Sequence, residues 1–73
     1  MLIKDFVKQV LNGKQKQVNG CFIIIKHNQV FEQYWYENNK LIYDIPDEIM
    51  NRSIDYDVHS YATEDWINFD LYL

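Results

Sequence analysis

The chain has 73 residues, of which 48% are hydrophobic, and a formal net charge of −4 at pH 7. A chain of this length forms a single domain, so we expect one domain over residues 1–73. Its only cysteine, Cys21, excludes a disulfide within the chain and is typical of a reducing, cytoplasmic environment. We find no signal peptide and no apolar run long enough to span a bilayer, and we therefore expect no membrane partner.

Apolar residues at helical spacing open the chain. They predict an amphipathic helix, and its apolar side consists of Ile3, Phe6, Val7, Val10 and Leu11. Asn12-Gly13 follows as a signal for the helix end, because glycine readily takes the left-handed backbone conformation there. Asn19-Gly20 is a strong hairpin signal, which predicts that residues 15–18 pair with the segment after it.

The central segment predicts strands that are separated by tight turns. Residues 21–25 are β-branched and aromatic and predict one strand, and residues 30–37 predict the next. His27-Asn28 and Asn38-Asn39 predict the turns that follow these strands, since asparagine tolerates a positive φ. Residues 41–45 predict a third strand.

The last third of the chain predicts a short helix and two further strands. Pro46 suits the start of a helix, and the following Asp47 and Glu48 suit its positive end. Residues 54–62 and 66–73 predict strands that are joined by a turn at residues 63–65. The predicted fold class is therefore α+β, with an antiparallel sheet of four to five strands, an N-terminal helix and a short middle helix.

Charge is divided unevenly along the chain. Residues 1–40 carry six basic and three acidic residues, a sum of +3, whereas residues 41–73 carry one basic and eight acidic residues, a sum of −7. An acidic surface with exposed aromatic side chains attracts basic proteins and repels phosphate. The second half thus predicts a surface for a basic protein or nucleoprotein, and its candidate residues are Asp55, Asp57, Tyr61, Glu64, Asp65, Trp66 and Asp70.

Two groups of residues resemble a metal site or a catalytic pair. Asp55, Asp57 and His59 would share one face of a strand, but same-face residues stand about 7 Å apart, too far for one ion. Cys21 could pair with His27 or with His59, but a thiol at the start of a hydrophobic strand is usually inert. We therefore expect no metal, no cofactor and no enzymatic activity.

The aromatic trio Tyr34-Trp35-Tyr36 leaves two hypotheses open. Neighbouring strand residues point to opposite faces, so either Trp35 or the two tyrosines are exposed. Exposed aromatic side chains stack on single-stranded bases, and they also form protein-binding hot spots. The deficit of Lys and Arg argues against direct nucleic-acid binding, so a sheet protein that binds single-stranded nucleic acid is the alternative.

Self-association into a structural domain is a third hypothesis. By alternation, several aromatic side chains must lie outside a small sheet. The last strand, residues 66–73, carries no Lys or Pro to protect its edge, which favours a symmetric homodimer. Glu64 and Asp70 near that edge would oppose such pairing, because like charges would meet across the two-fold axis.

Three segments of the chain resemble a known class of proteins. Residues 2–7 (LIKDFV), 45–50 (IPDEIM) and 67–71 (INFDL) resemble small early proteins of phages and mobile elements from low-GC Gram-positive bacteria. Several such proteins are anti-CRISPR or other host-takeover inhibitors, and some act as DNA mimics. The resemblance implies a phage-type, non-enzymatic inhibitor or adaptor. It would dock onto a basic host protein, such as a CRISPR effector, in the host cytoplasm.

Overall fold

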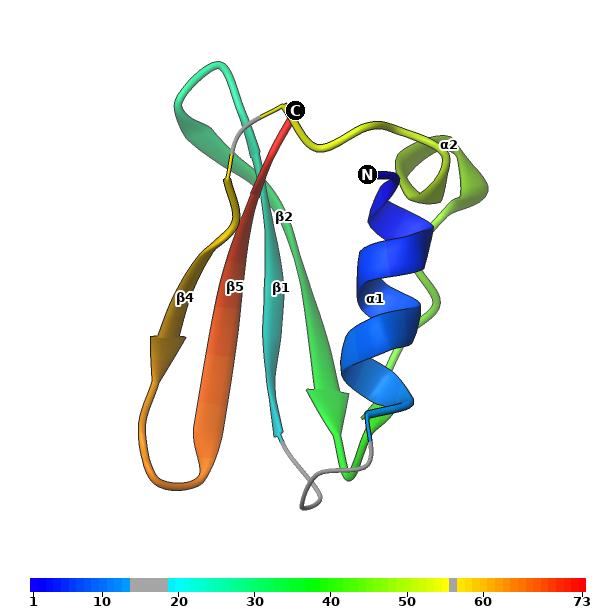
Figure 1. Cartoon of the computed structure of the whole chain (residues 1–73). Coiled ribbons are helices and arrows are strands. Elements are labelled where there is room, and N and C mark those ends of the chain that lie inside the picture. Colours follow the sequence, from blue (N-terminus) through cyan, green and yellow to red (C-terminus); the bar gives the residue numbers. More distant parts are fainter. Residues whose placement is uncertain (14–18, 56) are drawn as a thin grey trace.

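The residues that the structure describes, 1–13, 19–55 and 57–73, form a five-stranded sheet with a helix on one face (Figure 1). The coordinates are a computed structural model. In chain order the elements are α1 (Ile3–Leu11), β1 (Asn19–Lys26), β2 (Gln29–Glu37), β3 (Lys40–Leu41), α2 (Asp47–Met50), β4 (His59–Ala62) and β5 (Trp66–Tyr72). This α+β layout, with its N-terminal helix and short middle helix, confirms the predicted fold class.

The sheet is mixed, and its strand order is β3-β2-β1-β5-β4. The β1–β2 and β4–β5 pairs are antiparallel, as predicted for hairpins. Strands β1 and β5, however, run parallel, with Phe22 opposite Phe69. The prediction of a purely antiparallel sheet is therefore wrong at this pair. Turn signals fix the direction only of consecutive strands, and these two strands are far apart in sequence.

Two predicted turns are confirmed by the backbone. His27 and Asn28 have φ values of 54° and 62°, and Asn38 and Asn39 have values of 52° and 65°. Two successive left-handed residues make the two-residue hairpin turn whose twist matches that of the flanking strands. The four residues therefore explain why β2 turns back against both β1 and β3.

The predicted roles of the two glycines are wrong. Neither Gly13 nor Gly20 has a positive φ. Helix α1 ends at Leu11, and the capping residue Asn12 has a φ of −100°, so no left-handed glycine is involved. Asn19 and Gly20 belong to strand β1 and form no hairpin turn. The predicted pairing segment, residues 15–18, lies outside the described residues.

Two predicted strands are shorter in the structure. The third strand ends at Leu41, although residues 41–45 were predicted to be extended throughout. The strand predicted over residues 54–62 begins only at His59. Aspartate is unfavourable in strands, which accounts for the late start after Asp55 and Asp57. Tyr56 lies outside the described residues.

The core lies between α1 and one face of the sheet (Figure 1). Ile3 and Val7 of the helix are buried against a cluster that includes Phe22 and Leu71. Phe6 meets Phe22 and Phe69 edge to face, at centroid distances of 6.3 and 5.1 Å. Such T-shaped contacts are favourable because the positive ring edge meets the negative ring face. The aromatic packing thus joins the helix to both parallel strands.

The side chain of Tyr36 extends across strand β1 at the position of Gly20. Gly20 is the register partner of Tyr36 on one side and of Ile67 on the other. The Tyr36 hydroxyl donates a hydrogen bond to the Ile67 carbonyl oxygen at 2.7 Å, so one side chain links β2 to β5. A Cβ atom at Gly20 would collide with the Ile67 carbonyl and lie 2.5 Å from the Tyr36 hydroxyl. Glycine is therefore required here for space.

We predict that Gly20→Ala destabilises the fold by about 2 kcal/mol or more. The added methyl group has no free space, and overpacking of a well-packed region typically costs about 1–3 kcal/mol. Urea denaturation monitored by circular dichroism measures the change. Gly13→Ala is the matched control, because its Cβ would lie 3.4 Å from the nearest atom, the Gln9 carbonyl oxygen. Equal stability of the two variants would contradict the packing argument.

Removal of the Tyr36 hydroxyl gives a second prediction. Tyr36→Phe leaves the Ile67 carbonyl without this donor, which should cost about 1 kcal/mol at neutral pH. Burial raises the pKa of Tyr36 to about 12 from an ordinary 10.0. The folded state therefore holds this proton more tightly. The resulting stability is complete below pH 10 and is lost as the pH rises towards 12.

Tyr36→Phe should therefore lose less stability than the wild type between pH 10 and pH 12. Urea titrations at several pH values measure this difference. Tyr43→Phe is the control, because it removes a tyrosine hydroxyl from a side chain that is 76% exposed. Parallel pH profiles for the wild type and Tyr36→Phe would refute the assignment.

Candidate functional site

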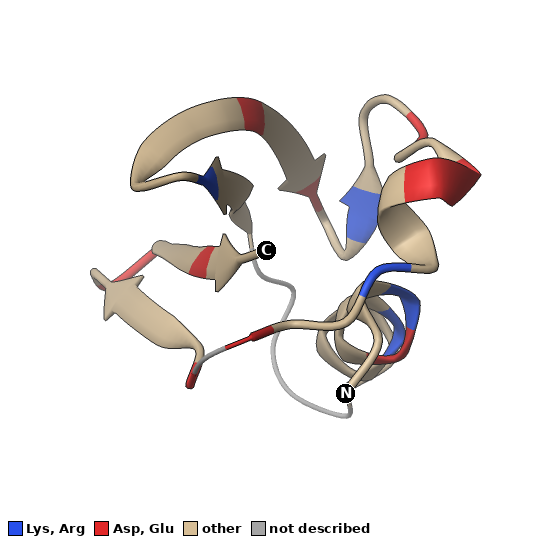
Figure 2. Ribbon diagram, turned by 90° about the horizontal axis from the view of Figure 1, so that it is seen from above, with Lys and Arg blue, Asp and Glu red and all other residues tan. Residues whose placement is uncertain are grey.

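The face of the sheet opposite α1 is the candidate site, and we call it the outer face. Both described helices lie on the other side of the sheet (Figures 1 and 2). Register partners share a face, so two rows of side chains cross the outer face from β4 to β2. One row is Tyr61, Asn68, Cys21 and Trp35, and the next is His59, Asp70, Ile23 and Gln33.

The two tryptophans of the chain meet at one end of the outer face. The rings of Trp35 and Trp66 have centroids 5.5 Å apart and planes at 58°. Trp35 is 43% exposed, and Tyr61, which is separated from it by strands β1 and β5, is 60% exposed. The Trp66 indole N–H donates to the Asn68 Oδ1, which holds the ring in place. We call Trp35, Tyr61, Trp66 and Asn68 the tryptophan end.

A pocket of about 170 Å³ opens at the tryptophan end, and its lining residues are Asn19, Trp35, Tyr36, Glu37, Ile42 and Trp66. The Asn19 Oδ1 accepts a hydrogen bond from the Asn38 backbone N–H at 2.9 Å. This bond ties the β2–β3 turn to the start of β1. Ile42 is 52% exposed and supplies an apolar wall. The pocket is thus aromatic and apolar, with one carboxylate.

The structure divides the predicted acidic residues between two places. Glu64 and Asp65 are exposed in the β4–β5 turn, directly before Trp66. Asp55 lies at the opposite end of β5, where its N–H donates to the Tyr72 carbonyl at 2.9 Å. At about 3.3 Å per strand residue, the two places are roughly 20 Å apart. Asp57 follows Asp55, so neither belongs to the tryptophan end.

Asp70 corrects the sequence prediction, because it is only 8% exposed. Strand β5 lies between β1 and β4, and Asp70 has Ile23 and His59 as its register partners. The sequence analysis predicted β5 as an edge strand, which is wrong because β1 and β4 flank it. Asp70 is therefore unsuited to an exposed acidic surface, and the edge pairing predicted for residues 66–73 is already used within the chain.

Acidic residues lie on several sides of the chain and do not gather on one face (Figure 2). Besides those around β4 and β5, exposed carboxylates lie at α2, where they are Asp47 and Glu48. Two carboxylates of β2, Glu32 and Glu37, occupy different faces, since Glu32 is the register partner of the core residue Ile24. The acidic half of the sequence therefore does not form one continuous acidic surface.

The aromatic trio is now assigned to faces. Tyr36 is buried and Tyr34 packs against the core, whereas Trp35 faces outward. The sequence analysis identified Tyr61, Trp66, Glu64 and Asp65, but it omitted Trp35, Asn19 and Glu37 from the site. Trp35 meets Trp66 only because β1 lies between β2 and β5, and no local pattern gives that arrangement.

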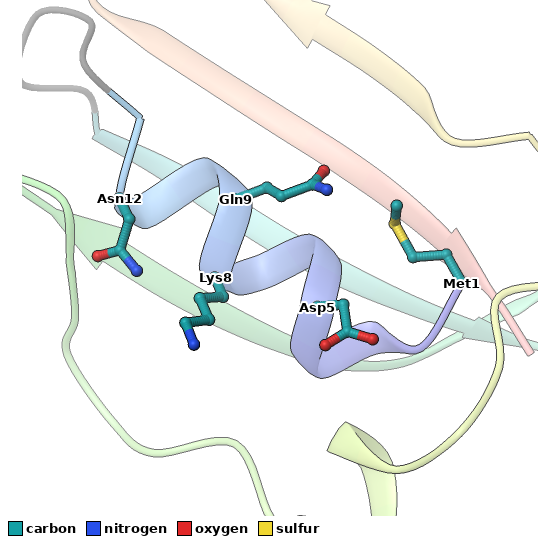
Figure 3. A pocket seen from close by; sticks show the side chains of 5 residues that line it. All are labelled: Met1, Asp5, Lys8, Gln9 and Asn12. Carbon is teal, nitrogen blue, oxygen red and sulfur yellow. The ribbon is translucent and has the colours of Figure 1, made fainter.

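A second hollow, of about 720 Å³, lies along α1 (Figure 3). Its lining side chains are Met1, Asp5, Lys8, Gln9 and Asn12. Met1 and Gln9 extend from one side of the helix, and Asp5 and Lys8 extend from the other. The polar groups therefore do not converge on one point, and this hollow has no arrangement that would bind a specific ligand.

The comparisons with known proteins found no relative, since no family model, curated protein or solved structure matches the chain.

Over residues 1–13, 19–55 and 57–73, no three His, Cys, Asp or Glu side chains are grouped to hold a metal ion. Asp55 and Asp57 precede β4, so the shared strand face assumed for them with His59 does not exist. Within the same residues, no helix is long and apolar enough to cross a membrane.

Cys21 is 1% exposed beneath the outer face. Burial raises the pKa of its thiol from 9.0 to about 11. The thiolate is the reactive form of cysteine, so this environment suppresses nucleophilic chemistry. His27 and His59 are both exposed, and His59 lies in the neighbouring row of the outer face.

We predict that Cys21 resists alkylation in the native protein at pH 7.5. Burial and a high pKa both reduce the exposed thiolate, so iodoacetamide should react at least 10-fold faster in 8 M urea than in buffer. Mass spectrometry of quenched samples measures both rates, with a free cysteine-containing peptide as the control for urea itself. Native labelling as fast as that of the peptide would contradict the burial.

Proposed function

We propose that the chain is a non-enzymatic inhibitor or adaptor that docks its tryptophan end onto a basic protein. The observation that carries this proposal is the contact of the exposed Trp35 with the half-buried Trp66 on a sheet face without a helix. Tyr61 extends the same surface. Tryptophan and tyrosine dominate binding energy at protein interfaces, because they bury a large area at low entropic cost.

Charge supports a basic partner. Glu37, Glu64 and Asp65 are exposed next to the tryptophan end, and the chain as a whole has a net charge of −4. Carboxylates around an aromatic centre steer a basic surface towards it and raise the association rate. Asp55 and Asp57 lie too far away for direct contact, and they add only to the long-range attraction.

The resemblance to small early phage proteins suggests the kind of partner. A host nucleic-acid enzyme, such as a CRISPR effector, has a basic groove that an acidic protein can occupy. In this proposal the chain acts in the host cytoplasm and needs neither a metal nor a cofactor.

Binding of single-stranded nucleic acid is the second candidate, and the exposed Trp35 favours it. Only Trp35 of the aromatic trio is on the outer face, which leaves Tyr34 and Tyr36 unable to stack on bases. Lys4 and Lys8 lie on α1, on the opposite side of the sheet. Near the tryptophan end, the described residues place three exposed carboxylates, Glu37, Glu64 and Asp65, against one lysine, Lys40, so the outer face has little attraction for phosphate. We therefore rank protein docking first.

The test compares variants of the chain as baits in bacterial lysates with and without nuclease treatment, followed by kinetics with the purified partner. Trp35→Ala should weaken binding at least 10-fold, as expected for a hot spot. The double variant Glu64→Gln/Asp65→Asn should lower the association rate and reduce its salt dependence. Asp47→Asn/Glu48→Gln, on α2, is the charge-matched control and should change the association rate less.

Two results would contradict the proposal. Equal affinity of the wild type and Trp35→Ala for the partner would exclude the tryptophan end as the interface. Retention that requires intact nucleic acid, together with gel-shift binding of single-stranded DNA that Trp35→Ala abolishes, would support the second candidate.

A further inference from the structure

The pocket at the tryptophan end has the size of one side chain. Its volume is about 170 Å³, below the roughly 300–1,000 Å³ of pockets that hold drug-sized ligands. Trp35 and Trp66 form two walls whose planes meet at 58°. Since the two rings already contact each other, a narrow, flat group would fit beside them, against the exposed side of Trp35.

The chemistry of the walls favours a cation. Tryptophan has the strongest attraction for cations among aromatic side chains, because of the negative charge on its ring faces. Glu37 places a carboxylate in the same lining. The Trp66 indole N–H and the Asn19 Oδ1 are already hydrogen-bonded to Asn68 and Asn38, respectively. These bonds fix the walls before a ligand arrives.

We propose that this pocket binds the guanidinium group of an arginine side chain from the protein partner, an inference that rests on the proposed function. A planar guanidinium stacks on indole and forms paired hydrogen bonds with a carboxylate, whereas the lysine ammonium does neither as well. Ile42 provides an apolar contact for the methylene stem of the arginine.

Among the residues that the structure describes, one cation lies beside the Glu37 carboxylate. Lys40 is the register partner of Glu37 across the β2–β3 hairpin and is exposed. It competes with an incoming guanidinium for the same carboxylate. Neutralising Lys40 should therefore tighten binding of arginine, which is the opposite of the effect expected from removing Glu37.

Tryptophan fluorescence tests the proposal directly, because both tryptophans of the chain line the pocket. The probe is N-acetyl-arginine amide, titrated into the full chain at low salt. We expect a saturable change with a dissociation constant of roughly 1–10 mM, as is usual for a small fragment. The citrulline counterpart has the same shape without the charge, and should bind at least about five times more weakly.

Variants make the test specific. Glu37→Gln should weaken binding of the arginine probe about three- to tenfold, and Lys40→Gln should strengthen it. Glu32→Gln is the matched control, since Glu32 lies on the same strand but on the other face. Circular dichroism confirms that each variant is folded. Equal binding of arginine and citrulline, an unsaturable change, or no effect of Glu37→Gln would overturn the proposal.

The test also separates this inference from the proposed function. Saturable arginine binding together with protein docking that is insensitive to Trp35→Ala would support the pocket and refute the docking surface. Docking that depends on Trp35, with no arginine binding, would support the surface and refute the arginine pocket.

Discussion

The crossing of Tyr36 over Gly20 to the Ile67 carbonyl is the contact on which the rest of the structure depends. It links the three central strands, and it also sets what faces outward. Trp35 and Glu37 flank Tyr36 in the sequence. Asn19 directly precedes Gly20, and Trp66 directly precedes Ile67. Since neighbouring strand residues point to opposite faces, the pocket at the tryptophan end is the reverse side of this inner contact.

This arrangement explains how a small chain can hold the side chains of its outer face in a fixed geometry. A short sequence buries a limited core, and side chains on a lone hairpin would be mobile. Here Trp35 and Trp66 extend from strands that are held by the Phe22 and Tyr36 packing beneath them. A preorganised surface loses less entropy on binding, so affinity can come from few contacts. In the proposed function, the carboxylates nearby would then favour a basic partner.

Much of the local structure could be predicted from the sequence, because it depends on neighbouring residues. Apolar spacing predicted α1, and His27-Asn28 and Asn38-Asn39 predicted the two tight turns. The parallel pairing of β1 with β5 could not be predicted, since no turn connects these strands. The unpredicted β1–β5 pairing also explains which site residues were missed. One predicted hairpin carries Tyr61, Glu64, Asp65 and Trp66. Trp35 and Glu37 lie near these residues only because β1 pairs with both β2 and β5. Asp70 was misplaced because β5 is an inner strand.

The central claim is that geometry at the tryptophan end, rather than overall negative charge, selects the partner. Chemical-shift mapping of the ¹⁵N-labelled chain with a hexa-arginine peptide tests this most directly. The account predicts that the largest shifts occur at the indole signals of Trp35 and Trp66 and at Glu37, with little change at Asp47 and Glu48. Shifts of similar size at all exposed carboxylates would contradict it, because they would indicate attraction by charge alone.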